Sequence, residues 1–142
     1  MSLLDKSAQN FEIARIASEK KYFDVAVSRL YYSSYQKIIY YKNDKILDGN
    51  SQFEMYKQEH ETDIETEKYG SHDWNIAFFE EKNKMLGLDG YESIISFLKD
   101  MKMSRNTADY KRRKICIESD EYKKFEDKTK LINAMIDKII GD

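Results

Sequence analysis

The stretch Ser104-Arg105-Asn106-Thr107-Ala108-Asp109-Tyr110 continues a helical pattern and puts a charge inside it. The apolar residues of this pattern recur at steps of three and four, the spacing of one buried helix face, and they are Ile94, Leu98, Met101 and Ala108. The same spacing places Arg105 on the inward stripe. A lone charge costs on the order of several kcal/mol to bury, so Arg105 needs a partner, a cleft or a contact with another chain. Asp109, four residues on, is within pairing distance. An intrahelical salt bridge and a functional site therefore both remain open.

The composition of the 142 residues is that of an all-α protein. The chain has no proline and only five glycines, so few residues interrupt a helix. Charged residues make up 35% of the chain and include many of the helix formers Lys and Glu. A chain of this length forms one domain that buries roughly two-thirds of its surface. We predict an antiparallel bundle of four to five helices within a single domain, residues 1–142.

Hydrophobic periodicity places the helices of this bundle. The expected helices cover residues 2 to 20, 23 to 42, 71 to 88, 91 to 114 and 119 to 141. The first has Ser2 and Asp5 as its capping pair, and Ser71 is the expected cap of the third. Two inner faces fit the first helix, one through Leu4, Ala8, Phe11 and Ala14 and the other through Ile13, Ile16 and Ala17.

Residues 43–70 form a polar insertion between the second and third core helices. Residues 50 to 70 contain six acids and only two lysines. Ser51 followed by Glu54 matches a capping box, which predicts a helix start there. Because few apolar residues follow, we expect a marginal solvated helix or a mobile insertion that ends at Gly70. His60 has no partners at metal-ligand spacing, so no metal site is predicted.

The net charge of −2 does not mark the whole chain as a nucleic-acid binder, but one segment is basic. Residues 99–114 hold seven Lys or Arg against two acids. Such a cluster either stabilises a helix end or binds nucleic acid. The sequence has no glycine-rich phosphate loop, zinc-ligand spacing or recognisable Ser/His/Asp set, and we expect no cofactor. A single cysteine, Cys116, and the lack of a signal or membrane-spanning run predict a cytoplasmic protein with no membrane contact.

Two more polar residues are candidates for a site. His72 falls in the first turn of the third core helix, where the helix dipole favours a neutral imidazole that can accept a proton. An exposed histidine without a role is the alternative. Arg29 lies on the polar flank of the second helix with Gln36, and we favour its pairing with an acid such as Asp109 over a phosphate contact. The second helix is also rich in tyrosine, which suits a cleft, an interface or ordinary core packing.

Two segments together resemble the HEPN family (higher eukaryote and prokaryote nucleotide-binding domain). They are Ala26-Val27-Ser28-Arg29-Leu30-Tyr31-Tyr32-Ser33-Ser34-Tyr35 and Ser104 to Tyr110, separated by the helix that opens with Ser71-His72. The resemblance implies a helical bundle that forms a homodimer, with the motif helices of both subunits meeting across a cleft. It also implies a setting in toxin–antitoxin or phage-defence systems, in which many members are metal-independent endoribonucleases encoded beside a nucleotidyltransferase-like partner.

The family's active motif is only partly present. Arg105 and Asn106 match it, whereas Tyr110, Lys111 and Arg112 stand at the positions where its histidine is expected. The candidate catalytic set is Arg105, Asn106, Asp109, Tyr110 and His72, and the candidate nucleic-acid-binding set is Arg29, Lys102, Lys111, Arg112 and Arg113.

Three functions fit this pattern. The first is RNA or nucleotide binding without catalysis, and the second is an endoribonuclease with an altered site. The third is an interaction partner of a nucleotidyltransferase-like protein, in which Tyr110 accepts a nucleotidyl group.

Overall fold

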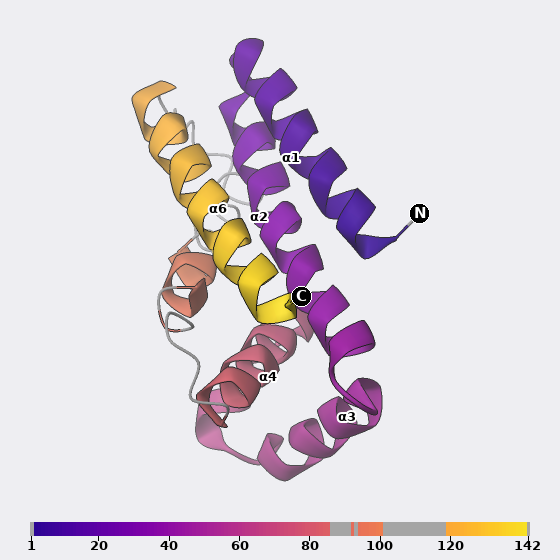
Figure 1. The fold of residues 1–142 in the computed structure, drawn as a ribbon. Coiled ribbons are helices and arrows are strands. Elements are labelled where there is room, and N and C mark those ends of the chain that lie inside the picture. Colours follow the sequence, from indigo (N-terminus) through magenta and orange to yellow (C-terminus); the bar gives the residue numbers. More distant parts are fainter. Residues whose placement is uncertain (1, 86–91, 93, 101–118, 142) are drawn as a thin grey trace.

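The computed structural model describes residues 2–85, 92, 94–100 and 119–141 (Figure 1). Helices dominate these residues and no strand occurs among them, which confirms the all-α class. The elements are α1 (Leu3–Glu19), α2 (Phe23–Tyr40), the π-helix η1 (Tyr41–Lys45), α3 (Gly49–His60), the 3₁₀-helix η2 (Ile64–Thr66), α4 (Ser71–Met85) and α6 (Ser119–Ile140). Residues 94–100 are helical as well.

The long helices α1, α2 and α6 lie side by side, with α2 between the other two, and α3 and α4 cross below them (Figure 1). A tight turn through Lys21, whose φ is 63°, makes α2 antiparallel to α1. The helix α6 runs in the same direction as α2. Its Asn133 and Asp137 contact Ser34 and Lys37 in the same order along both helices. The bundle therefore contains one antiparallel and one parallel pair around α2.

The main core is built on α2, which buries one long face of apolar and small side chains. Its buried side chains are Ala26, Val27, Leu30, Tyr31, Ser33, Ser34, Tyr35 and Ile38. On α6, Thr129, Ile132 and Ile136 recur at steps of three and four and are buried against it. Ile94 and Leu98 are fully buried. These two described residues of the stripe predicted to continue to Arg105 therefore face the core.

The buried face of α1 coincides with neither predicted face, although it shares Ala14 with the first and Ala17 with the second. Its buried residues are Ser7, Asn10, Ala14 and Ala17, whereas Ile13 and Ile16 are 42% and 48% exposed. Small side chains let α1 approach α2 closely, and Ser7 Oγ donates to the Ser33 carbonyl at 2.5 Å. The face of α1 is thus chosen by fit and hydrogen bonding, and the larger isoleucines stay outside.

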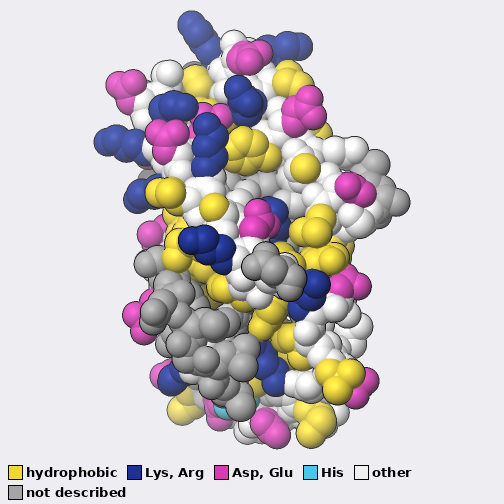
Figure 2. All heavy atoms as spheres, in the orientation of Figure 1, with side chains coloured by type: hydrophobic (Ala, Val, Ile, Leu, Met, Phe, Trp, Pro, Cys, Tyr) yellow, Lys and Arg dark blue, Asp and Glu magenta, His cyan; other side chains and the backbone are white. Residues whose placement is uncertain are grey.

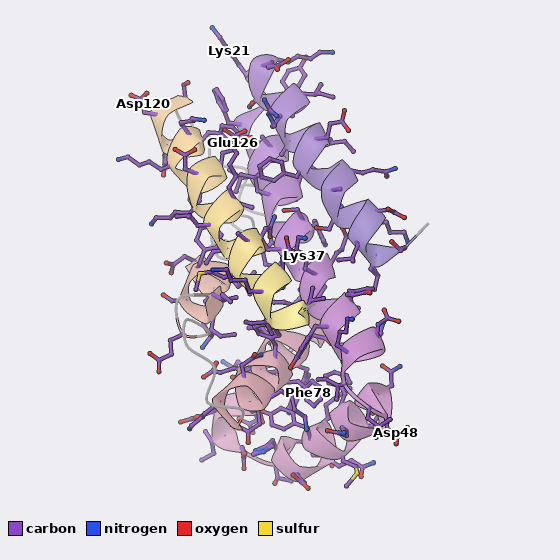
Figure 3. All side chains as sticks on the ribbon, in the orientation of Figure 1. Lys21, Lys37, Asp48, Phe78, Asp120 and Glu126 are labelled. Atoms are coloured by element: carbon purple, nitrogen blue, oxygen red, sulfur yellow. The ribbon has the colours of Figure 1, made fainter. Side chains whose placement is uncertain are left out.

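The polar insertion is more ordered than predicted, because it builds a second small core with α4. Phe53 of α3 is buried against Trp74 and Phe78 of α4, with Tyr56 and Tyr69 packed around them. Figure 3 shows Phe78 in the space between α4 and α3. The prediction of a marginal, solvated helix is therefore wrong for the buried side of α3.

Two predicted helix caps are also wrong. The helix α3 begins at Gly49 after Asp48, which has a left-handed φ of 52° and makes no side-chain cap, so Ser51 lies inside the helix. At α4 the Gly70 carbonyl accepts the first helical bond, from Trp74 N. Asp73 accepts the Gly70 amide at 3.1 Å, so Gly70 holds the capping position that was assigned to Ser71.

Candidate functional site

An aromatic stack joins α2 to the first turn of α4. The His72 ring lies parallel to that of Tyr35, with the ring centroids 4.1 Å apart and 8° between the planes. The Tyr31 ring stacks at 5.6 Å from the same imidazole, and its hydroxyl is 2.8 Å from His72 Nδ1. Tyr32 meets the imidazole edge-on at 5.8 Å. Three tyrosines of one helix thus surround a single histidine of another.

A chain of hydrogen bonds leads from this stack to the second core. Asn75 Nδ2 donates to Tyr35 Oη at 3.1 Å, and Lys42 Nζ donates to Asn75 Oδ1 at 2.9 Å. The same ammonium lies 4.2 Å from the centroid of the Phe53 ring. His72 stacks on Tyr35, and the two hydrogen bonds lead on from Tyr35 to Lys42. Because Tyr35 and Asn75 are buried, this connection between the half-buried His72 and the half-buried Lys42 runs through the protein interior.

Local backbone geometry positions the two ends of this chain. After Tyr40 the helix widens into the π-helix Tyr41–Lys45, a rare form that is common at functional sites, and Lys42 lies within it. Ile46 N donates to the Tyr41 carbonyl at 3.2 Å as the π-helix ends. On α4, a step of three residues puts His72 and Asn75 on one face, towards α2.

Burial sets the electrostatics of the stack. It raises the pKa of Tyr35 to about 12, a rise that the hydrogen bond from Asn75 opposes and the nearby Tyr32 and Asp73 increase. Tyr35 therefore remains a neutral phenol near neutral pH and supplies an aromatic surface. The Tyr31 hydroxyl and the His72 imidazole share one hydrogen bond, whose donor depends on the histidine tautomer. Such a pair can hold or pass a proton.

Of the predicted site residues, His72 and Arg29 lie in the described part of the chain, and the structure does not bring them together. Arg29 Nη1 donates to Asn10 Oδ1 at 3.2 Å, and Asn10 Nδ2 donates to Gln36 Oε1 at 2.9 Å. Arg29 and Gln36 share a flank of α2, as predicted. Arg29 is thus held against α1, whereas the aromatic stack faces α4. Its pairing with Asp109 stays a prediction.

The remaining predicted residues cannot be placed in this arrangement. Lys102, Arg105, Asn106, Asp109, Tyr110, Lys111, Arg112 and Arg113 lie outside the described residues, and so does Cys116. Their catalytic or nucleic-acid-binding roles stay predictions, and so does the transfer of a nucleotidyl group to Tyr110.

Sequence reasoning did not pick out Lys42 and Asn75 as members of the site. A weak signal existed for Asn75, which stands three residues after His72 on the same helix face. Lys42 carried no such signal, because its contact with Asn75 depends on where α4 crosses the end of α2 and on the π-helical turn.

His60, which stands among acids in the sequence, forms a local pair with Asp63, with Nδ1 and the carboxylate 2.8 Å apart. Within the part of the chain that the structure describes, no group of three or more His, Cys, Asp or Glu is placed to hold a metal ion. The helices described there include none long and apolar enough to cross a membrane.

The face drawn in Figure 2 has no block of one charge among its coloured residues. Acidic and basic side chains alternate over its upper part, and hydrophobic side chains run down its middle (Figure 2). No family model, curated protein or solved structure matches the chain. A functional proposal therefore rests on the geometry of the stack and on the two sequence segments 26–35 and 104–110.

Proposed function

We propose that the chain is a HEPN-like RNA- or nucleotide-binding protein and that the stack around His72 forms part of its binding surface. The supporting observation is that the half-buried His72, which opens the helix between the two segments of the resemblance, stacks on the buried Tyr31 and Tyr35 of the first segment. Aromatic side chains and histidine are common stacking partners of unpaired bases, and each stacked base contributes about 1–3 kcal/mol. The family resemblance supplies the setting, which is a homodimer in a toxin–antitoxin or phage-defence system, and the single cysteine favours the cytoplasm.

RNA binding by purified protein tests this proposal. The fluorescence anisotropy of a labelled single-stranded RNA should report binding whose affinity falls steeply with added salt, because phosphate contacts release counterions. His72→Ala should weaken binding about tenfold, the loss of one stacking contact. His60→Ala, which changes the chain's other histidine, is the matched control and should bind like the native protein. Salt-independent binding, or equal effects of the two substitutions, would contradict the proposal.

A second candidate is a metal-independent endoribonuclease with an altered site, and the Tyr31–His72 hydrogen bond is the observation that favours it. In this reaction the ribose 2′-hydroxyl attacks the adjacent phosphate, a base accepts the hydroxyl proton, and the 5′-oxygen leaves. His72 would act as that base, in place of the histidine that the arginine motif lacks, and Arg105 is the expected stabiliser of the phosphorane charge.

Cleavage in the presence of a chelator separates the two candidates. An enzyme would give products ending in a 2′,3′-cyclic phosphate, and both His72→Ala and Arg105→Ala would abolish them. Tyr31→Phe, which keeps the stack but removes the hydroxyl, should reduce the rate and shift its pH profile. RNA that is bound but not cleaved would rule out the enzyme and support the binding function only.

A further inference from the structure

Three lysine ammonium groups gather around the second core and have uncharged partners. Lys42 Nζ lies 4.2 Å and Lys57 Nζ 5.4 Å from the centroid of the Phe53 ring. Lys82 Nζ lies 5.5 Å from the centroid of the Phe78 ring and donates to Gln52 Oε1. The two rings are themselves 5.5 Å apart, so the three charges belong to one cluster.

The half-buried lysines of this cluster differ in their partners from the cations that form ion pairs elsewhere in the described chain. Lys37 pairs with Asp137 at 2.6 Å, and Lys123 pairs with Glu126 at 3.0 Å. Among the described residues, by contrast, no carboxylate lies within ion-pair distance of the ammonium groups of the cluster, which are those of Lys42, Lys57 and Lys82. An aromatic ring or an amide oxygen holds an ammonium group in place without cancelling its charge.

The electrostatics of Lys42 reflect burial and two neighbouring charges. Burial lowers the pKa of Lys42, the positive charge of Lys57 lowers it further, and the nearby Glu54 carboxylate works in the opposite direction. Each lysine is half-buried, so its charge is less screened than that of a fully exposed side chain. Cations that lie around one pair of packed rings and form no ion pair with a described carboxylate are suited to an anionic ligand.

We propose that Lys42, Lys57 and Lys82 form a binding site for a phosphate group on the side of the second core. They come from three separate elements, η1, α3 and α4, so the insertion completes the site. A phosphate has several acceptor oxygens and can receive a charge-assisted hydrogen bond from each of the three ammonium groups. The inference does not depend on RNA binding at the His72 stack, although the Lys42–Asn75–Tyr35 chain connects the two places.

Inorganic tripolyphosphate is the probe for this site, and the chain supplies its own reporter. Trp74 is the only tryptophan and packs in the same small core as Phe53 and Phe78. Titration at low salt should change the Trp74 fluorescence with saturation at one equivalent, and calorimetry should give the same affinity. A native protein that neither changes its fluorescence nor releases heat would overturn the proposal.

Single substitutions identify the lysines that bind. Lys42→Met, Lys57→Met and Lys82→Met keep the aliphatic stems and should each weaken tripolyphosphate binding about threefold to tenfold, the loss of one charge-assisted contact. Lys45→Met and Lys84→Met are the controls, because they lie exposed in the same η1 and α4 and remove the same charge. Glu54→Gln should tighten binding about twofold, since it removes an opposing charge. Equal losses in the cluster and control variants would contradict a defined site.

Competition identifies the source of the phosphate. If single-stranded RNA competes with tripolyphosphate and loses affinity in the same three variants, the site holds a backbone phosphate. If RNA does not compete and the variants lose affinity for tripolyphosphate but not for RNA, the site holds a free polyphosphate. Both results support the site. RNA binding that depends on His72 while tripolyphosphate fails to bind would overturn the phosphate site and leave the proposed function standing.

Discussion

A single backbone contact at Gly49 fixes how α3 leaves the π-helical turn. A Cβ at this position would lie 1.8 Å from the Lys42 carbonyl oxygen and 3.3 Å from Ile46 Cβ. Gly49→Ala forces the backbone to move, and we expect the free energy of unfolding to fall by at least about 2 kcal/mol in urea titrations. Gly70→Ala is the control, because its Cβ would meet only an Asp73 oxygen at 4.0 Å and should cost less than about 1 kcal/mol. Equal losses would show that the contact at Gly49 is not restrictive.

The phenol of Tyr35 makes stability depend on alkaline pH. Burial raises its pKa to about 12, so the folded chain retains this proton more tightly than the unfolded chain, in which the pKa is near 10.0. Below pH 10 both states are protonated and the residue adds no pH dependence. Between about pH 10 and 12 the unfolded chain ionises first, and the free energy of unfolding falls.

Tyr35→Phe should therefore reduce the alkaline loss of stability by about 1 kcal/mol at pH 11, one pH unit above the unfolded pKa. It should also cost about 1 kcal/mol at neutral pH, because the bond from Asn75 is lost. Burial also raises the pKa values of Tyr41 and Tyr56, so only the difference between the variant and the native protein reports on Tyr35. Urea titrations at about pH 8 and about pH 11 measure this difference. If the free energy of unfolding falls equally in both proteins between these pH values, the assignment to Tyr35 is contradicted.

At the scale of elements, a polar seam holds α6 to α2. Ser34 Oγ donates to Asn133 Oδ1 at 2.7 Å, and Asn133 Nδ2 donates to Ser33 Oγ at 3.3 Å. Both serines are fully buried. Asn133→Ala leaves the Ser34 hydroxyl without its acceptor, and we expect a loss of about 1–3 kcal/mol in the free energy of unfolding. Lys130→Ala, on an exposed position of the same helix, should change it by less than about 0.5 kcal/mol. A similar result for both would argue against the seam.

The elements show how far a single sequence predicts this fold. The helix α6 followed its pattern, because Thr129, Ile132 and Ile136 meet a broad apolar surface at regular steps. The predicted faces of α1 were incomplete, because its close packing against α2 favours small residues such as Ser7 over isoleucine. The start of α3 was wrong because Asp48 adopts a left-handed conformation that no local sequence signal demanded.

At the scale of the whole molecule, the two cores share few residues and should respond separately to damage. Ile46 packs against both of them, whereas Phe53 belongs only to the second. Phe53→Ala opens a cavity worth about 3–5 kcal/mol within the second core. We expect the Trp74 fluorescence transition to move to lower urea than the far-ultraviolet circular dichroism transition. Val27→Ala in the main core should shift both transitions together. Coincident transitions in the Phe53 variant would mean that the cores unfold as one unit.

The candidate site was harder to predict than the fold, because its contacts depend on how helices cross. The sequence placed His72 in a first helical turn, and that position holds. Its stacking on Tyr35 depends on a crossing of α4 over α2 that joins residues far apart in the chain. Lys42 and Asn75 entered the site for the same reason. Periodicity along one helix carries no information about which neighbouring helix its face will meet.

The most direct test of the central claim uses the two histidines of the chain as reporters. Their imidazole ring signals in a proton–carbon NMR spectrum can be assigned with His60→Ala and His72→Ala. During titration with single-stranded RNA at low salt, the His72 signal should shift and saturate with the binding curve, because a base comes to lie against the stack. The His60 signal should move less. An RNA that binds while the His72 signal stays unchanged would contradict a binding surface at the tyrosine–histidine stack.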